Sequence, residues 1–344
     1  MKLLWKSVMI VIIVLMLLVV ALAGFVVYKL SLIDYNDGRL DNQTEFQPTE
    51  EGSANPGDMT FGELIIDTSG LEEMETIPVI PDTDIQESKD VVNILLLGTD
   101  AYSGALTQYA RSDSMILVSI NKKEHTVKLV SLERGMGVYM ETGEQAGKWD
   151  LLTHAFRWGG AALVCDCVEK HLRVEVDYYV RVTFTTVSTV VDAIGGIDME
   201  LTNREAAALR EWFPHLQGGM NHLNGAQALR FARLRSIDSD WQRVERQRKV
   251  ILAAVDALQG ASLKELNNLL DQTLPLIQTD MPMLEIAELM LYAPTFLQSE
   301  FDQMTIPEQG TYGYKEGITG FAVDYEVNSQ ILKDFLYGTE ETDE

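Results

Sequence analysis

An uncharged run near the N-terminus limits what this chain can fold into more than any other feature. Val8 to Tyr28 are 21 consecutive residues without a charged side chain. At about 1.5 Å of rise per residue, a helix of that length crosses a hydrocarbon core of about 30 Å. Two lysines precede the run, and acidic residues dominate after Lys29. The positive-inside rule therefore predicts a single span over 8–28, a cytoplasmic N-terminus at 1–7, and an extracytoplasmic remainder.

A cleaved signal peptide is the alternative interpretation of this run. Ala21-Leu22-Ala23 resembles a cleavage site, but the apolar run continues to Tyr28 and is long for a signal peptide. The length favours a retained membrane anchor. Under either interpretation the rest of the chain works outside the cytoplasmic membrane.

The next stretch is strongly acidic. Residues 31–90 contain sixteen Asp or Glu and only two basic residues. Such a segment repels itself and buries little apolar area, so we expect an extended linker over 29–90. Its segment FGELIIDTSGLEEM is apolar enough to form a short element that docks on the main domain. Residues 91–340 suit one domain of about 250 residues with a full core.

Hydrophobic patterning within 91–340 alternates between strand and helix. Continuous or alternating apolar runs predict strands, and apolar residues at helical spacing predict helices. Strands are predicted at 91–100, 114–120, 126–132, 178–184 and 197–201, helices at 151–172 and 185–194, and strand candidates near 302–306 and 320–324 in a largely helical last third. This alternation predicts an α/β fold in which a mixed central sheet lies between helices.

Composition and motifs exclude several classes of protein. The formal net charge is −25, from 52 acidic and 27 basic residues, so binding to a nucleic-acid backbone is not expected. Cys165 and Cys167 are spaced C-x-C within a helical pattern and have no histidine at zinc-site spacing, which indicates two packed thiols. The chain has no G-x-S-x-G, H-E-x-x-H or P-loop motif.

Against this acidic background, the segment RFARLRSIDSDWQRVERQR at 230–248 contains six arginines. Arg233 and Arg235 are two apart and would share a face in an extended chain. Asp240 is a good N-cap, and it would place Arg243 in the first helical turn, where the helix dipole favours an anion. Arginine in place of lysine suits bidentate phosphate binding. The cluster predicts a site for a compact anion such as pyrophosphate, with a solvated basic face as the alternative.

A second group of charged residues flanks the first predicted strands. Asp100 ends one strand, Arg111 and Asp113 precede the next, and Arg134 follows the hairpin. If these strands are neighbours, the four side chains meet at one edge of the sheet, where α/β folds bind ligands. Two carboxylates beside a pyrophosphate favour Mg²⁺. Taken singly, each residue would instead be interpreted as a loop salt bridge.

Together these motifs resemble the LytR-CpsA-Psr family of cell-envelope proteins. The resemblance covers about 91–258 closely and the helical tail more loosely. It rests on NILLLGTD, ARSDSMILVSIN, SLERG, LLTHAFRWGG, DYYVRVTF, VDAIGGIDMEL, HLNGAQALRFARLR and DSDWQRVERQRKVI. It implies a phosphotransferase that moves a glycopolymer from a polyprenyl-pyrophosphate carrier to peptidoglycan, uses Mg²⁺ or alternatively Mn²⁺, and holds the prenyl chain in an apolar cleft.

The resemblance also implies roles for particular residues. Metal binding falls on Asp100 and Asp113, and the proton acceptor is either Asp240 or Asp113. The predicted catalytic residues are Arg111, Arg134, Asp240 and Arg243, and the predicted substrate-binding residues are Arg111, Arg134, Arg233, Arg235, Arg243 and Gln247.

This chain departs from the family pattern at one motif. Where the family usually reads Ile-Pro-Arg-Asp, it has Leu132-Glu133-Arg134-Gly135. Glu133 brings a charge, and Gly135 removes a polar group, but no arginine is lost, so the chemistry is expected to survive. Two other functions stay open: a non-catalytic binder of prenyl pyrophosphate or wall polymer acting as a regulator or attenuator, and a pyrophosphatase.

Overall fold

The structure is a computed structural model. It describes residues 24–39, 66, 68, 70–99, 110–234, 237–260, 262–296, 298–299 and 301–338. Among these, seven strands form one mixed sheet in the order β1-β10-β7-β2-β3-β4-β11. The strands are β1 (Asp34–Tyr35), β2 (Val91–Thr99), β3 (Ser112–Asn121), β4 (Thr126–Leu132), β7 (Tyr178–Thr183), β10 (Gln278–Thr279) and β11 (Phe301–Ile306).

The centre of the sheet confirms the strands that the apolar runs predict. β2 pairs antiparallel with β3 and parallel with β7, and β3 pairs antiparallel with β4. The hairpin turn is held by Asn121, whose side-chain oxygen accepts from the backbone N–H groups of Lys123 and Glu124 at 3.0 and 2.9 Å. The ends of β2 and β4 therefore lie beside the start of β3.

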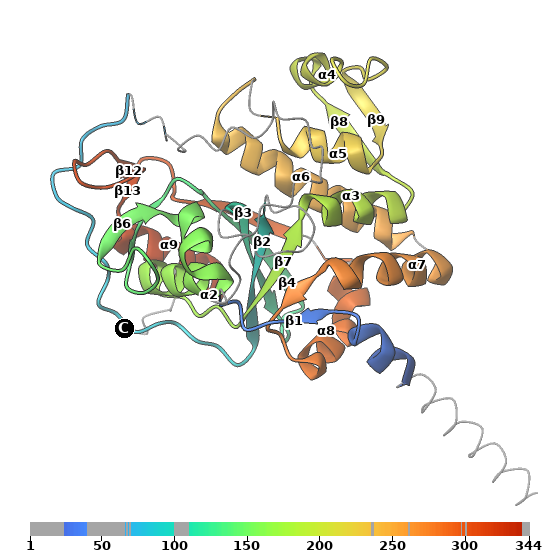
Figure 1. Cartoon of the computed structure of the whole chain (residues 1–344), viewed down its shortest axis with the longest axis horizontal. Coiled ribbons are helices and arrows are strands. Elements are labelled where there is room, and N and C mark those ends of the chain that lie inside the picture. The colour runs from blue at the N-terminus through green and yellow to red at the C-terminus, as the bar shows by residue number, and fades with distance from the viewer. Residues whose placement is uncertain are drawn as a thin grey trace, which may run out of the picture.

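One face of this sheet is covered by α2 (Leu152–Leu172) and α9 (Tyr325–Tyr337). Strand side chains such as Leu95, Leu97 and Leu117, all 0% exposed, pack there in the largest core cluster. Figure 1 shows these two helices together on the left of the sheet. We call this side the closed face.

The other face is covered by α6 (Asp240–Gln259) and α8 (Met283–Phe296). Its core is smaller: Ile116, Val127 and Leu129 are buried, but many apolar neighbours are only partly buried. The partly buried side chains of this face, from both strands and helices, are Leu96, Val118, Ile120, Tyr178, Val180, Ile251, Leu252, Ile286, Leu289, Tyr292 and Phe301. We call this side the open face.

A small lobe extends from the sheet beyond α6, at the upper right of Figure 1. Its elements are α3 (Phe184–Ala193), β8 (Ile197–Leu201), α4 (Asn203–Leu209), β9 (Gly219–Leu223) and α5 (Gly225–Ala232). The strand predicted at 197–201 exists as β8, but it pairs with β9 and does not join the central sheet. Its alternating pattern of buried and exposed residues specifies one apolar face, which packs against the helices of the lobe.

The remaining elements complete the fold. Phe301–Ile306 (β11) confirms the predicted strand near 302–306 and pairs parallel with β4. Of the predicted strand near 320–324, Ala322 and Val323 pair in a small separate sheet, and Phe321 forms an isolated bridge with Met136. The other elements are β5 (Gly137–Met140), β6 (Lys148–Leu151), α7 (Leu263–Thr273), the 3-10 turn η2 (Leu274–Leu276), β12 (Tyr312–Gly313) and β13 (Ala322–Val323).

Described parts of the expected acidic linker contact the domain. Asp34–Tyr35 forms β1 and pairs with β10, Glu73 bridges to Tyr314, and Gln86 bridges to Val174. These backbone pairings hold the described parts of 29–90 against the domain, although the segment is acidic. These parts are therefore not a free linker.

The predicted membrane span lies mostly outside the described residues. Only 24–28 of 8–28 are described, as part of a helix over 24–30. Within the described part of the chain, no helix has the length and apolar character that crossing a membrane requires. The span therefore stays a prediction.

Candidate active site

The candidate site is built around Arg134, the second residue after β4. The Nη1 of Arg134 donates to Asp113 Oδ1 at 2.7 Å, and its Nε donates to Asp240 Oδ2 at 2.8 Å. Asp113 lies at the start of β3 and Asp240 at the start of α6, so one guanidinium joins the sheet edge to the helix N-terminus. Arg134 is only 6% exposed. Charge-assisted bonds of this kind fix the geometry of all three side chains.

Arg243 adds a second guanidinium to the same carboxylate. It is 1% exposed, and its Nη2 donates to Asp240 Oδ2 at 2.9 Å and to the backbone oxygen of Asp113 at 3.2 Å. Arg134 and Arg243, more than one hundred residues apart, therefore converge on Asp240.

Asp240 does not occupy the predicted N-cap position. Ser239 is the N-cap of α6, without a side-chain cap bond, and Asp240 is the first helical residue. The carboxylate of Asp240 accepts hydrogen bonds from the two arginines. The prediction that Arg243 lies in the first turn is confirmed.

Burial and charge act in opposite directions on Arg134. Burial alone would lower the pKa of this guanidinium, but the charges of Asp113 and Asp240 and its hydrogen bonds to both raise the pKa above its usual value. Arg134 is therefore permanently cationic. A buried permanent cation at a sheet edge is a suitable group for binding an anionic ligand.

Glu133 has an unusual environment beside these residues. It is 0% exposed, and neither carboxylate oxygen has a hydrogen-bond partner. Burial, followed by the charge of Asp240, raises the pKa of Glu133 to about 8, against the opposing effect of Arg243, Arg134 and Arg248. The expectation that Glu133 brings a charge is corrected: at neutral pH its side chain is mostly a neutral acid.

Gly135 occupies the position where the family usually has an aspartate. A Cβ built at this glycine would lie 2.9 Å from Ile66 and 3.0 Å from Phe321. The space beside Gly135 is therefore filled by apolar side chains, one of them from the N-terminal acidic stretch.

Of the other predicted site residues, the structure describes Arg111, Gln247 and Arg233. Arg111, just before β3, and Gln247, on α6, are partly buried. Arg233 is exposed, and its guanidinium carbon lies 4.1 Å from the centre of the Phe184 ring. Asp100 and Arg235 lie outside the described residues.

Arg233 also has a backbone that differs from the expected one. It caps α5 with φ −100° and ψ 3°, which is not extended. The premise that Arg233 and Arg235 leave one face of an extended chain is therefore wrong at Arg233, because α5 continues up to it.

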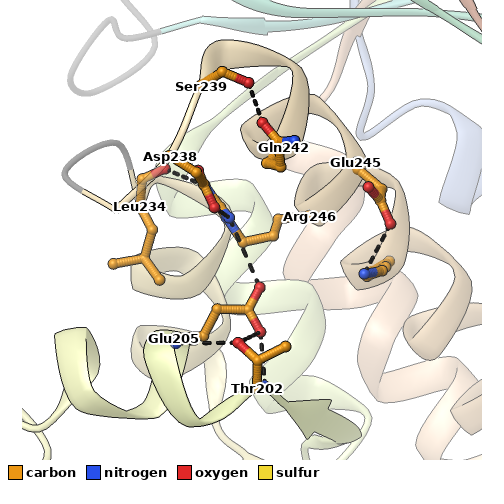
Figure 2. Close-up of polar contacts among 9 residues, drawn as sticks. Thr202, Glu205, Leu234, Asp238, Ser239, Gln242, Glu245 and Arg246 are labelled. Carbon is orange, nitrogen blue, oxygen red and sulfur yellow. Dashed lines mark hydrogen bonds and ion pairs between the residues drawn. The ribbon is translucent and has the colours of Figure 1, made fainter.

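Not all six clustered arginines belong to the site, and Arg246 is the clearest exception. Its two terminal nitrogens bind both carboxylate oxygens of Asp238 at 2.7 Å, and Nη2 also donates to the oxygen of Leu234 at 2.7 Å. The Oε1 of Glu205, on α4, lies 3.7 Å from the Nη1 of Arg246 (Figure 2). Arg246 thus ties α6 to the chain that precedes it and to the small lobe.

Arg248 and Arg230 also have separate environments. The Nη1 of Arg248 donates to Ser131 Oγ and Thr305 Oγ1 at 2.6 and 2.7 Å, which joins α6 to β4 and β11. The guanidinium carbon of Arg230 lies 3.5 Å from the centre of the Trp212 ring. The sequence pattern could not separate these structural arginines from Arg243.

Thr153 was missed by the sequence analysis. Its Oγ1 donates to the oxygen of Ser112 at 2.9 Å, and its backbone N–H donates to the oxygen of Arg134 at 3.2 Å. This threonine at the start of α2 therefore supports the backbone beside both Asp113 and Arg134. The only available signal was its place inside the LLTHAF motif.

The fold and the site define an α/β protein with a buried arginine–aspartate network where β2 and β4 end and α6 begins. The model of the LytR_cpsA_psr family matches residues 67–335. The chain belongs to this family.

Relatives with assigned names are similar over much of the domain. A protein of Enterococcus faecalis named polyisoprenyl-teichoic acid–peptidoglycan teichoic acid transferase TagU is 31% identical over 241 residues, which cover 69% of this chain and 76% of that protein. TagT of Bacillus subtilis, named as the same type of transferase, is 33% identical over 185 residues, or 52% of this chain and 56% of TagT. The match to TagT thus spans little more than half of that relative.

Solved structures share the fold. The crystal structure of B. subtilis TagT is 26% identical, with a TM-score of 0.56, over 77% of this chain and 98% of that one. A structure described as TagT bound to LIIa-WTA is 25% identical, with a TM-score of 0.55, over 80% of this chain and 98% of that one. The predicted α/β fold with a mixed sheet between helices is confirmed.

Proposed function

We propose that this protein is an extracytoplasmic phosphotransferase, anchored by residues 8–28, that moves a glycopolymer from a polyprenyl-pyrophosphate carrier to peptidoglycan or another envelope acceptor. Membership of the family and the names of its relatives support this reaction class. The observation that carries the proposal is the convergence of Arg134 and Arg243 on Asp240 at a sheet edge.

The charges of the site suit a pyrophosphate diester. Four predicted ligand-binding guanidinium groups, those of Arg111, Arg134, Arg233 and Arg243, lie among the described residues, against two carboxylates, Asp113 and Asp240. Among these described groups the guanidiniums outnumber the carboxylates, and Glu133 adds no negative charge while it is protonated. A pyrophosphate linked at both ends carries two negative charges, which an excess of positive charge attracts.

In the proposed reaction, a hydroxyl oxygen of the acceptor forms a bond to the phosphorus that carries the sugar. The bond from that phosphorus to the bridging oxygen breaks, and polyprenyl monophosphate leaves with the electron pair. Phosphoryl transfer depends mainly on alignment and charge neutralisation. Arg134 and Arg243, which are fixed by Asp113 and Asp240, provide oriented donors for the phosphate oxygens.

Asp240 is the better placed of the two candidate proton acceptors. The side chain of Asp240 is 24% exposed, against 11% for Asp113. Both arginine contacts to Asp240 use Oδ2, which leaves Oδ1 to take the proton of the acceptor hydroxyl. Asp113 is better suited to holding Arg134 in place.

The donor set is compatible with Mg²⁺, or with Mn²⁺ in its place. Mg²⁺ typically binds one or two carboxylates together with substrate phosphate oxygens and water. Within the described residues no group of three or more potential metal ligands occurs. Asp113, together with Asp100, would supply the carboxylates, and the metal would neutralise charge on the pyrophosphate when bound.

The open face supports the lipid part of the proposal. Its apolar side chains, including Leu96, Ile251 and Leu252, retain exposed surface close to the helix that carries Arg243. A prenyl chain needs an apolar surface beside the site of its head group, and these residues provide one.

The proposal is tested by incubating the full chain in liposomes with a polyprenyl-pyrophosphate glycan, Mg²⁺ and peptidoglycan fragments, and weighing the products by mass spectrometry. We expect a glycan–phosphate–peptidoglycan conjugate together with polyprenyl monophosphate. Free glycan phosphate alone would identify a pyrophosphatase. Binding of the carrier without turnover would identify a binder or regulator, and either result would contradict the proposal.

A further inference from the structure

The short helix over 24–30 packs against the domain. Leu30 and Ile33 are 2% and 8% exposed and form an apolar cluster with Leu274. Met283 and Ile286 of α8 pack against the same cluster. Figure 1 shows this helix, in dark blue, beside α8 at the lower right. The chain therefore enters the domain along α7 and α8.

Polar contacts fix this entry. Lys29 is 4% exposed and forms an ion pair with Asp271 of α7. Asp34 Oδ2 accepts a hydrogen bond from Gln278 Nε2 at 2.9 Å, next to the parallel pairing of β1 with β10. Only a few residues separate the helix from the central sheet, so the connection is a fixed one.

The side of α8 that faces away from the sheet is apolar and exposed. Leu284 and Leu291, seven residues apart and therefore on one side of the helix, are each 80% exposed, and Met290 is 42% exposed. The two charged residues of α8, Glu285 and Glu288, both pair with Lys122 at 3.5 and 3.3 Å. One lysine balances only one of these two carboxylates, and Glu288, four residues after Leu284 and three before Leu291, is 45% exposed on the same side. The exposed side of α8 is therefore mainly apolar and carries one carboxylate.

We propose that the outer side of α8, together with the helix over 24–30, docks on the lipid surface of the membrane. The proposal rests on the proposed anchor at 8–28. The apolar run at 8–28 includes the first residues of this helix, whose Phe25, Val27 and Tyr28 are 45%, 55% and 58% exposed, and the helix packs next to α8. A bilayer is the partner that the uncharged run at 8–28, whose last residues form part of this helix, places next to this surface.

Docking in this orientation links the anchor to the carrier. The inner side of α8 packs on the open face through Ile286, Leu289 and Tyr292. A membrane contact on its outer side would bring this apolar face within reach of a prenyl chain that remains in the bilayer. The membrane contact would therefore orient the site as well as retain the protein.

The test uses the full chain in liposomes with a fluorescent NBD label at Leu284→Cys or Leu291→Cys. The matched control is Met220→Cys, 71% exposed on β9 in the small lobe. Protein without an introduced cysteine, treated with the same label, gives the background signal. Labelling of the two native cysteines is suppressed, because burial raises the pKa of the Cys165 thiol and raises that of Cys167 to about 12. Nitroxide groups on the lipid chains act as the quencher.

We expect at least about twofold stronger quenching at positions 284 and 291 than at 220, as burial of an apolar side in the interface requires. The double variant Lys29→Gln and Asp271→Asn should reduce quenching at 291 while the protein still floats with the liposomes. Equal quenching at all three positions would overturn the docking. A blue-shifted emission at 284 and 291 without lipid quenching would show a protein contact, such as a second copy, and would also overturn it.

The result is separable from the proposed chemistry. A chain that shows the quenching pattern but transfers no glycan would keep the docking surface and lose the enzymatic function. If the protein does not float with liposomes, the proposed anchor at 8–28 is wrong, and the docking proposal that rests on it is wrong as well.

Discussion

On the closed face of the central sheet, under α2 and α9, Leu95 and Leu97 are fully buried, whereas Leu96, between them on the same strand, lies on the open face under α6 and α8 and is only partly buried. Side chains at alternate positions of one strand are therefore fully buried on the closed face and only partly buried on the open face. The closed face holds the fold together, and the open face keeps apolar surface for a ligand. The site lies at the sheet edge, beside the helix that begins with Asp240.

The largest expected effect is on the closed face. Leu95→Ala should lower the free energy of unfolding by about 3 to 5 kcal/mol, because it leaves a cavity in a fully packed cluster. Chemical denaturation of the purified full chain in detergent measures this. A loss below about 1 kcal/mol would show that the closed face is not the main source of stability.

Arg243→Ala should lower turnover by about 10²-fold or more, as removal of one transition-state donor does in other enzymes. The matched control is Lys249→Ala on the same helix, where the lysine is 50% exposed and pairs with Glu245. The rate of conjugate formation is the measurement. Wild-type turnover in Arg243→Ala, with the control unchanged, would remove Arg243 from the mechanism.

Glu133→Gln should change stability in a pH-dependent way. The pKa of Glu133 is raised to about 8 in the folded protein by burial and by Asp240, so the wild-type side chain is neutral and tolerated at pH 5. Its contribution to stability is lost as the pH rises through 8. The glutamine variant should be close to the wild type at pH 5 and exceed it by several kcal/mol at pH 9, since the pKa of Glu133 rises by about 3.5 units, from 4.5 to about 8, and one unit corresponds to about 1.4 kcal/mol.

Thermal unfolding across this pH range measures the difference. Glu124→Gln, in the exposed turn of the β3–β4 hairpin, is the control and should show no such trend. A constant difference between Glu133→Gln and the wild type from pH 5 to pH 9 would mean that Glu133 is already ionised at low pH.

The smallest expected effect on stability is on the open face. Leu96→Ala should cost about 1 kcal/mol, because its side chain is only partly buried. If the open face holds the prenyl chain, the same change should raise KM for the lipid carrier several-fold and leave kcat nearly unchanged. A cost equal to that of Leu95→Ala would erase the distinction between the two faces.

Sequence alone predicted the centre of the sheet better than its edges. The mostly apolar run predicted as a strand at 91–100 corresponds to β2, since strands buried on both sides contain few polar residues, and the strand predicted at 126–132 corresponds to β4. The two-residue strand Asp34–Tyr35 lies in an acidic stretch and has no such signal. Its place is determined by pairing with Gln278–Thr279, far away in the sequence.

The site was predictable in part for the same reason. Arg134 and Asp113 were placed together by the expected pairing of their strands, and the structure shows their ion pair. The different roles of Arg243, Arg246 and Arg248 were not predictable, because side chains two to five residues apart on one helix meet different neighbours. The neutral state of Glu133 depends on burial, which the sequence does not display.

The most direct test is the preference of the protein for a pyrophosphate head group. Isothermal titration calorimetry on the full chain in detergent would compare polyprenyl pyrophosphate with polyprenyl monophosphate, for the wild type, Arg134→Ala, Arg243→Ala and the Lys249→Ala control. Because Arg134 and Arg243 meet at Asp240, we expect the wild type and the control to bind the pyrophosphate at least about tenfold more tightly, and either arginine variant to lose that preference. Equal affinity of the wild type for the two lipids, or an unchanged preference in both variants, would contradict a pyrophosphate site at these arginines.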